Sequence, residues 1–397
     1  MSKQMTDAVI VEACRTPIGT AYKGTLADTS AFTLAEEIVK AAVARSGIDP
    51  EVVDDLLLGE VLYGGGDVAR HAALTAGLAS IPGAAMNRHC ASGMAAVQSA
   101  AASIIAGMDE VVIAGGAASL STGPVSRWRL PGTDDVNEHW ISPSHPDRPD
   151  APNLDMSITV GWNSAQRAGV SREEMDAWAL RSHQRAVAAI DAGAFDAELV
   201  PVEVQHRDGT STTFAIDEHP RRNSSAEKLA SLAPLHPEIE GFSITAGNAS
   251  GINDGAAALV LCSAERAGAL GLEPLATIRG WASVGVDPAE TGLGPVKAIP
   301  KALKRCGLDI TDVDLFEINE AFASMCVATS RLLELDEDIV NVSGSGCSLG
   351  HPVAATGARM LVTLLHELRR RGGGIAVASM CAGGGMGSAT VMEVAAP

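Results

Sequence analysis

The sequence predicts an α/β protein in which layers of helix surround a mainly parallel sheet. Two observations lead to this fold class. Short apolar runs rich in β-branched residues alternate with Ala-rich stretches of helical length, and strand–helix–strand repetition is typical of parallel α/β layers. In addition, the 397 residues are 46% hydrophobic but only 3% aromatic, which indicates elements that pack closely through small side chains.

The first part of the chain contains the clearest alternation. Its predicted elements are strands over 8–11, 55–58 and 110–114 and helices over 33–46 and 91–106. The second helix consists mostly of Ala, Ser and Gly and has little polar face, so we expect it to be buried between layers.

The middle of the chain departs from this pattern. Residues 119–153 contain six prolines and few aliphatic runs, which predicts loops over the body of the fold. Residues 171–192 predict a helix that begins with a capping box, and the Asp208-Gly209 pair predicts a β-hairpin. Helical structure is expected again over 253–261.

The two halves of the chain repeat an order of features. Cys90 precedes a helix, a glycine break and the strand sequence VVIAGG, and His351 precedes a helix, a glycine break and the strand sequence IAVASMCAGGG. An approximate duplication would place these two residues at equivalent helix N-termini. Chance similarity between two common strand–helix–strand units is the alternative.

The charge balance excludes several classes of partner. The chain carries 29 Lys and Arg against 48 Asp and Glu, a formal net charge of −19 at pH 7. Such a field repels phosphate backbones and anionic membranes, so we expect no nucleic-acid or membrane partner. No apolar run approaches the ~18 residues of a membrane span, and the N-terminal segment has no signal-peptide pattern. The seven cysteines have no CxxC spacing, which favours a cytoplasmic protein without a zinc site.

Two residues stand where a nucleophile and a base would stand. Cys90, in NRHCASGM, directly precedes a predicted helix. The N–H groups and the partial positive charge of a helix N-terminus would lower the pKa of its thiol; a buried structural cysteine is the alternative. His351, before Pro352 in GHPVAATGAR, is also expected at a helix start. A neutral imidazole there could take a proton from a thiol; a capping or packing histidine is the alternative.

Two further segments carry candidate polar groups. Cys381 precedes three glycines at a predicted strand end, and such a loop can offer N–H groups to an oxyanion, although a flexible turn is the alternative. Asn319 and Glu320, with Glu317 nearby, lie among apolar residues in LFEINEAFA. Buried carboxylates and amides are costly without partners, so these groups have partners or a chemical task; a capped helix start is the alternative.

Five sequence blocks together allow a family comparison. They are NxxCASGM around Cys90, TAGNASGINDGAA at 245–257, INEAFA at 318–323, LGHPxxATGAR at 349–359 and CAGGGMG at 381–387. In this order, across nearly the whole chain, they resemble the thiolase family. Two cysteines with a single histidine also favour thiolases over the related ketoacyl synthases, which use a pair of histidines beside their cysteine.

The resemblance implies a thiolase-like, five-layered α-β-α-β-α fold built from two similar halves. We expect an N-terminal half over 1–118 and 246–275, an inserted loop domain over 119–245, and a C-terminal half over 276–397. The implied reaction is a ping-pong acyl transfer, by thiolytic cleavage of 3-ketoacyl-CoA or by condensation of acetyl-CoA. Acyl-CoA and coenzyme A are the expected substrates in fatty acid metabolism, without metal or redox cofactor, and a homodimer or tetramer is the expected assembly.

The resemblance also implies roles for the catalytic residues. Cys90 is the acylated nucleophile and His351 the group that activates it. Cys381 is the second acid/base, which protonates the acetyl-CoA enolate in cleavage or deprotonates acetyl-CoA in synthesis. Asn319 orients a water that binds the enolate oxygen together with His351. The N–H groups of Cys90 and Gly383 form the other oxyanion hole.

Coenzyme A contacts follow less directly. Ser250 matches the serine that contacts the pantetheine arm, Arg221 matches a basic residue near the nucleotide, and Ala246, Met156 and Phe322 are further expected binding residues. A surface arginine is the alternative for Arg221.

The sequence also departs from the family pattern. In the loop LDMSITVGWN at 154–163, Asp155 occupies the position of a histidine and a glutamate is missing, which tilts the prediction toward an unusual or bulky acyl group. Two other classes remain as alternatives at this stage. One is a non-catalytic acyl-CoA or lipid binder, and the other is a dinucleotide oxidoreductase, which the incomplete GxGxxxG at 344–350 disfavours.

Overall fold

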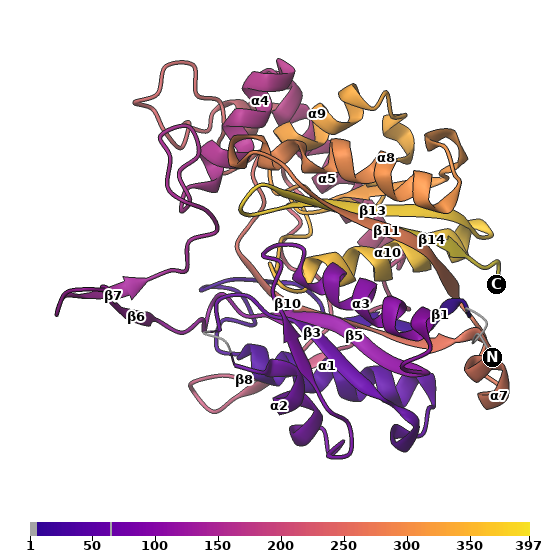
Figure 1. Ribbon diagram of the computed structural model, residues 1–397. Helices are drawn as coiled ribbons and strands as arrows, with labels where there is room; N and C mark the ends of the chain where they lie inside the picture. Colours follow the sequence, from indigo (N-terminus) through magenta and orange to yellow (C-terminus); the bar gives the residue numbers. More distant parts are fainter. Residues whose placement is uncertain (1–5, 64–65) are drawn as a thin grey trace.

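The chain folds into five stacked layers of helix and sheet. The computed structural model describes residues 6–63 and 66–397; residues 1–5, which begin the N-terminal segment considered above, lie outside this description. Helix α8 (Gly294–Cys306) covers one outer face, α3 (Ser92–Ala106) and α10 (Thr356–Arg371) lie between the sheets, and α1 (Ala31–Ser46) and α2 (Val68–Thr75) cover the other face (Figure 1). The expected five-layered α/β architecture is confirmed.

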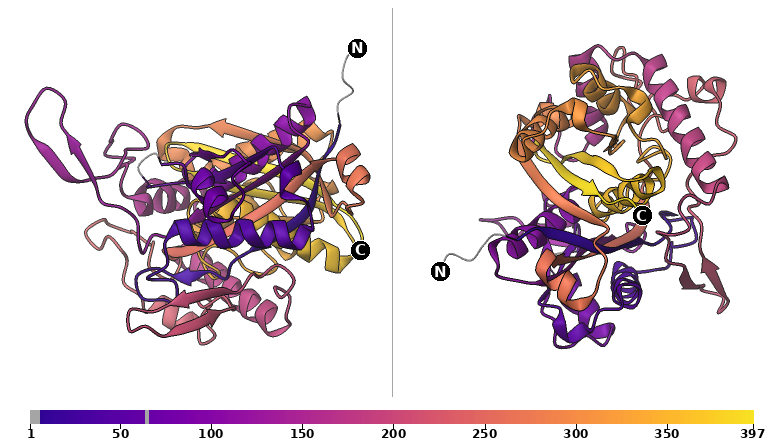
Figure 2. Two further views of the ribbon diagram at one scale, coloured as in Figure 1. Left: turned by 90° about the horizontal axis from the view of Figure 1, so that it is seen from below. Right: turned by 90° about the vertical axis from the view of Figure 1, so that its right-hand side faces the viewer.

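In the described residues, ten strands form one continuous sheet with two parts of matching order, which we call the N-terminal and C-terminal sheets. A short antiparallel pairing between the first strands of the two parts joins them. The N-terminal sheet runs β1 (Ala8–Arg15), β10 (Asn253–Ser263), β5 (Val111–Ala118), β3 (Asp55–Gly59), β4 (Ala84–Met86), with β2 (Gly19–Thr20) on one end of β10. The C-terminal sheet runs β11 (Ala276–Gly285), β14 (Met386–Val394), β13 (Gly374–Ala382), β12 (Leu315–Ile318). In each sheet the last strand in sequence lies between two earlier ones: β10 lies between β1 and β5, and β14 lies between β11 and β13. The two similar halves are confirmed, and Figure 2 shows one stacked on the other.

The sheets are mixed, and the prediction of a mainly parallel sheet is wrong. The pairs β3–β5, β3–β4 and β12–β13 are parallel, whereas β1–β10, β10–β5, β11–β14 and β13–β14 are antiparallel. Helix–strand alternation reveals the parallel crossovers, but each half then adds a return strand. In the C-terminal half a tight glycine turn makes that return, which forces an antiparallel neighbour.

The expected helix over 253–261 is a strand instead. Every residue of β10 is buried, because the strand lies between β1 and β5 in the centre of its sheet. A strand covered on both faces has no polar alternation, and its many alanines imitate a helix.

Residues 119–153, which were expected to form only loops, contain a two-stranded hairpin. Strands β6 (Ser126–Arg129) and β7 (Val136–Trp140) form an arm that projects from the body (Figures 1 and 2). The predicted hairpin at Asp208-Gly209 is present as β8 (Val202–Gln205) and β9 (Ser211–Phe214). The predicted capping box begins α5 (Arg172–Asp191). The remaining elements are the π-helix Ser157–Trp162, α4 (Asn163–Ala168), α6 (Ala226–Ala230), α7 (Ala264–Leu270), α9 (Ala323–Leu332) and four short 3-10 turns, Pro50–Val52, Pro288–Leu293, Ile310–Asp312 and Glu337–Ile339.

The two central helices touch at their N-terminal ends. A Cβ on Gly93 of α3 would lie 2.7 Å from the carbonyl oxygen of Ala354, and a Cβ on Gly357 of α10 would lie 2.6 Å from the backbone nitrogen of Met94. Around this contact, ten of the fifteen residues of α3 are buried, in agreement with the predicted place between layers. No helix in the described ranges is long and apolar enough to cross a membrane.

This contact predicts a stability effect. Replacing Gly357 with Ala would drive a methyl group into the backbone of α3, and we expect the free energy of unfolding to fall by about 1–3 kcal/mol. Urea denaturation would measure it. Gly268→Ala on α7 is the control, because nothing lies within 4 Å of its Cβ position, so stability there should be unchanged or slightly raised.

Candidate active site

Cys90 lies one residue before the N-cap of α3 and is partly exposed. The N–H groups of Gly383 and of Cys90 itself act on the sulfur and lower the pKa of the thiol, but burial has the larger effect and raises it overall. The expected lowering of this pKa is therefore wrong, because removing the thiolate from water outweighs the two N–H groups. A protonated thiol needs a base to become a nucleophile.

His351 has the features of such a base. Its Nδ1 lies 2.7 Å from the Thr356 hydroxyl, which donates to the Pro352 carbonyl oxygen at 2.9 Å. Since that hydroxyl proton is committed, Nδ1 must carry the imidazole proton and donate to it. Nε2 is then the free lone pair, and it is buried without a partner within the described part of the chain. Burial, aided by the charge of Arg359, lowers the pKa of His351 to about 4, so the ring is neutral at pH 7.

The position of His351 differs in one respect from the prediction. Helix α10 begins at Thr356, and residues 352–355 form a turn that separates it from His351. Instead, the backbone N–H of His351 donates to Asn253 Oδ1 at 3.0 Å. Two side chains, Thr356 and Asn253, thus position His351, and neither was predicted from the sequence.

Cys381 is the second-last residue of β13. Its thiol donates to the sulfur of Met325 at 3.6 Å. Burial raises the pKa of Cys381 far above the usual value, and the negative charge of ionised Cys90 raises it further. The two cysteines are therefore close enough to interact, and the loop after Cys381 brings the Gly383 N–H to Cys90. Cys381 is suited to act as an acid.

Asn319 joins the same site. Its backbone N–H donates to Ser379, two residues before Cys381, at 2.9 Å, and its Nδ2 lies 3.5 Å from His351 Nδ1. Its Oδ1 is buried and lacks a partner among the described residues. Orphaned buried polar atoms call for an unseen water or ligand. Asn319 and His351 each present one such atom.

The other predicted contacts gather around Phe322. The N–H of Ser250 donates to the Ala321 carbonyl oxygen at 2.9 Å, and Ala249 pairs with Phe322, which brings the loop containing exposed Ala246 against the segment after β12. The Phe322 ring lies directly on Gly161 of the π-helix, which Met156 precedes.

Arg221 lies at the edge of this surface. It is exposed, and its backbone N–H donates to His183 Nδ1 at 3.2 Å. The ring of His219, two residues before it, packs against Gly251, next to Ser250.

Hydrogen bonds and an ion pair of the Asp155 carboxylate hold the loop at 154–163, which departs from the family pattern. The Asp155 carboxylate accepts the N–H and hydroxyl of Ser157 at 3.0 and 2.6 Å, and it pairs with His236 Nε2 at 2.8 Å. Asp155, which stands where the family has a histidine, therefore has its own set of hydrogen-bond and ion-pair partners in this loop.

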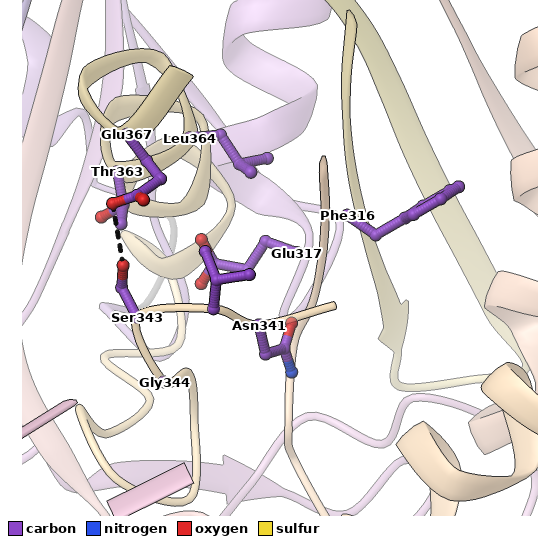
Figure 3. A pocket seen from close by; sticks show the side chains of 9 residues that line it. Phe316, Glu317, Asn341, Ser343, Gly344, Thr363, Leu364 and Glu367 are labelled. Atoms are coloured by element: carbon purple, nitrogen blue, oxygen red, sulfur yellow. Dashed lines mark hydrogen bonds between the residues drawn. The ribbon is translucent and has the colours of Figure 1, made fainter. Parts of the chain in front are cut away.

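A small polar cavity lies apart from these residues. Figure 3 shows it between β12 and α10, lined by Glu317, Asn341, Ser343, Thr363 and Glu367 among others. None of the predicted catalytic residues lines it. Within residues 6–63 and 66–397, no group of three or more His, Cys, Asp or Glu side chains could hold a metal ion.

The neutral state of His351 has a measurable consequence. His351, His183 and His219 all have pKa values lowered to about 4 from 6.5, mainly by burial. Between these values the unfolded chain binds more protons, so stability falls as pH falls from 6.5 to 4. We expect His351→Gln to flatten this dependence, measured as urea midpoints at pH 7 and pH 5. Exposed His139→Gln should leave it unchanged, and an equally steep His351→Gln slope would contradict a buried neutral ring.

Comparisons with known proteins identify the family of this chain. Models of the "Thiolase, N-terminal domain" and the "Thiolase, C-terminal domain" match residues 8–265 and 272–394. An acetyl-CoA acetyltransferase of Escherichia coli is 43% identical, covering 98% of this chain and 99% of that protein. A probable acetyl-CoA acyltransferase of Staphylococcus epidermidis is also 43% identical, with the same coverage.

Solved structures give the same result. The Bacillus anthracis acetyl-CoA acetyltransferase superposes with a TM-score of 0.92 at 42% identity, covering 99% of this chain and all of that one. Human mitochondrial 3-ketoacyl-CoA thiolase gives 0.90 at 38% identity with the same coverage. Since sequence and fold agree over almost the entire length, the chain belongs to the thiolase family of acyltransferases.

Proposed function

We propose that this protein transfers an acyl group between coenzyme A thioesters through an acyl-Cys90 intermediate. The observation that carries the proposal is the convergence of Cys90, Cys381, Asn319 and His351, with the Gly383 N–H at the Cys90 sulfur. The direction is thiolytic cleavage of 3-ketoacyl-CoA or condensation of acetyl-CoA.

In cleavage, His351 Nε2 takes the Cys90 proton, and the thiolate attacks the 3-keto carbon. The oxyanion that forms is held by the N–H groups of Cys90 and Gly383. The carbon–carbon bond then breaks, the acyl group stays on Cys90, and the acetyl-CoA enolate takes a proton from Cys381. The protonated Nε2 of His351 and a water on Asn319 Oδ1 would donate to the enolate oxygen.

The second half returns each group to its starting state. The coenzyme A thiol gives its proton to the Cys381 thiolate and attacks the acyl-Cys90 carbonyl carbon. The tetrahedral intermediate collapses, acyl-CoA leaves, and the Cys90 thiolate regains its proton from His351. The steps are proton transfers, one carbon–carbon bond cleavage and a thioester exchange, with no net oxidation or reduction, so we propose coenzyme A as substrate and no metal or redox cofactor.

We assign the surface around Phe322 to the pantetheine arm and acyl group. Ser250 and Ala246 would contact the pantetheine arm, Met156 and Phe322 the acyl side, and Arg221 the nucleotide end. The support is their arrangement, since the Ser250 segment, the Phe322 segment and the π-helix touch one another. A mostly apolar, concave site is typical for such ligands.

We further propose a homodimer or dimer of dimers that works in the cytoplasm in fatty acid metabolism, with neither nucleic acid nor membrane as partner. The support for self-assembly is the projecting β6–β7 arm, on which Trp128 stacks on Trp140 at 4.7 Å while Leu130 and Val136 remain exposed. Exposed apolar groups of this kind mark protein contacts. Light scattering would give the mass of the assembly, and a monomer would contradict this part.

The decisive experiment measures thiolysis over a series of 3-ketoacyl-CoA chain lengths, with mass spectrometry of the intact protein. We expect turnover and an acyl adduct on the Cys90 peptide. Coenzyme A binding without adduct or turnover would instead support a non-catalytic acyl-CoA or lipid binder, which the names of the relatives disfavour.

A further inference from the structure

Glu320, the residue after Asn319, is a fully buried carboxylate that accepts four hydrogen bonds. One oxygen accepts from Trp178 Nε1 at 2.8 Å and from Asn341 Nδ2 at 3.0 Å. The other accepts from the Ser182 hydroxyl at 2.6 Å and from the backbone N–H of Cys347 at 3.0 Å. A carboxylate with four donors is fully satisfied, so it needs no substrate to explain its burial.

These donors come from three separate parts of the chain. Trp178 and Ser182 lie on α5, in the segment between the two parts of the N-terminal half. Asn341 holds the end of β12, since its amide pairs with both the N–H and the carbonyl of Ile318. Figure 3 shows Asn341 at the edge of the polar cavity, with its amide nitrogen directed away from Glu367. Glu320 therefore joins α5 to the strand end that carries Asn319.

The Cys347 bond connects Glu320 to the loop that leads to His351. This loop runs against the Asn319–Glu320 peptide, because a Cβ on Gly346 would lie 2.7 Å from the Glu320 carbonyl oxygen and 2.8 Å from Asn319 Oδ1. The separation of Asn319 and His351 thus depends on how closely these two loops approach. The Glu320 carboxylate helps to fix that approach, because it accepts from the Cys347 N–H, alongside the bonds of Asn341 to Ile318.

We propose that Glu320 is a positioning residue for the reaction: it sets Asn319 against His351 by fastening both of their loops to α5. It does not touch the reacting atoms and acts through Asn319. This inference rests on the proposed function, in which Asn319 and His351 bind the enolate oxygen.

Glu320→Gln tests this with almost no change of shape. If the nitrogen of the new side-chain amide in the Glu320→Gln variant faces Ser182 and Cys347, the Ser182 hydroxyl can rotate and accept from it. The Cys347 N–H, however, loses its acceptor. If the amide nitrogen faces Trp178 and Asn341, it meets two donors that cannot turn, because the Asn341 amide is fixed on Ile318. In both orientations a buried donor is left unpaired, and the loops are free to shift. Misplacement by about 1 Å lowers a rate by about 10²-fold.

The experiment is a double-mutant cycle on the full-length protein, with kcat for thiolysis and KM for coenzyme A as readouts. We expect Glu320→Gln to lower kcat by about 10- to 100-fold with little change in KM. We expect the effects of Glu320→Gln and Asn319→Ala to be less than multiplicative in the double variant, because the Asn319 amide is then absent and only the His351 loop is left to position.

Glu198→Gln is the matched control. Glu198 is also a fully buried glutamate, but its partners are Arg15 and Thr363 in another network. It should lose stability in urea while keeping kcat, which separates loss of folding from loss of positioning. Multiplicative effects in the cycle, or a Glu320→Gln enzyme as active as the parent, would overturn the inference. A parent protein without thiolysis would instead overturn the proposed function.

Discussion

Replacing Cys90 with Ala is expected to remove acyl transfer, with kcat for thiolysis reduced by about 10⁵- to 10⁶-fold, as for the loss of other enzyme nucleophiles. The reason is that no other sulfur can take its place. Cys381 has a still higher pKa and donates to Met325, whereas the Gly383 and Cys90 N–H groups act on the Cys90 sulfur. Coenzyme A affinity should be retained, because the residues proposed to bind it lie around Phe322. The measurements are steady-state thiolysis and calorimetric titration with coenzyme A.

Cys306→Ala is the matched control for Cys90→Ala. Cys306 is also partly exposed, but it lies on the outer helix α8, where its thiol donates to the Ala302 carbonyl oxygen. Its replacement should leave kcat unchanged. Residual turnover of Cys90→Ala within tenfold of the parent would remove Cys90 from the nucleophile's role.

Replacing Cys381 with Ala is expected to separate the two halves of the reaction. Cys90 should still be acylated by acyl-CoA, since its activation is proposed to depend on His351 and on backbone N–H groups, and coenzyme A can leave as a thiolate without a proton from Cys381. Cleavage of the carbon–carbon bond should slow by about 10²- to 10⁴-fold, because the enolate has lost its proton donor. Quenched-flow mass spectrometry would follow the acyl adduct, and spectrophotometry would follow 3-ketoacyl-CoA.

The control for this change is Cys262→Ala. Cys262 is buried in β10, and burial likewise raises its pKa, to about 11. Both half-reactions should survive its loss. If cleavage by Cys381→Ala runs at the parental rate, another group donates the proton, and the role given to Cys381 is incorrect.

The sequence was sufficient to select candidate reacting groups but not to predict their environments. Cys90, Cys381 and His351 could be predicted because each stands beside small residues at the end of a recognisable element. The pKa of Cys90 could not, because the partial charge of a helix end is visible in sequence whereas the loss of water around a sulfur is not. Burial alone reverses the sign of that prediction.

The missed residues have a common cause as well. Thr356 and Asn253 hold His351, and Met325 accepts from Cys381, yet each is an ordinary residue whose role depends on a contact distant in sequence or across a turn. The error over β10 is of the same kind, since a strand that is covered on both sides has no periodic signal. Glu320 was recognised as a buried group with partners or a task, and the structure supplies the partners.

The close contact at Gly93 and Gly357 has an evolutionary consequence. Because the opposite backbone excludes a side chain at Gly93 and at Gly357, substitutions at these two positions cannot readily change the spacing of the central helices. Substitutions that adapt the enzyme to new acyl groups must then accumulate at the periphery, in segments such as 154–163. Descendants of this scaffold can diversify in what they accept while inheriting the same reaction unaltered.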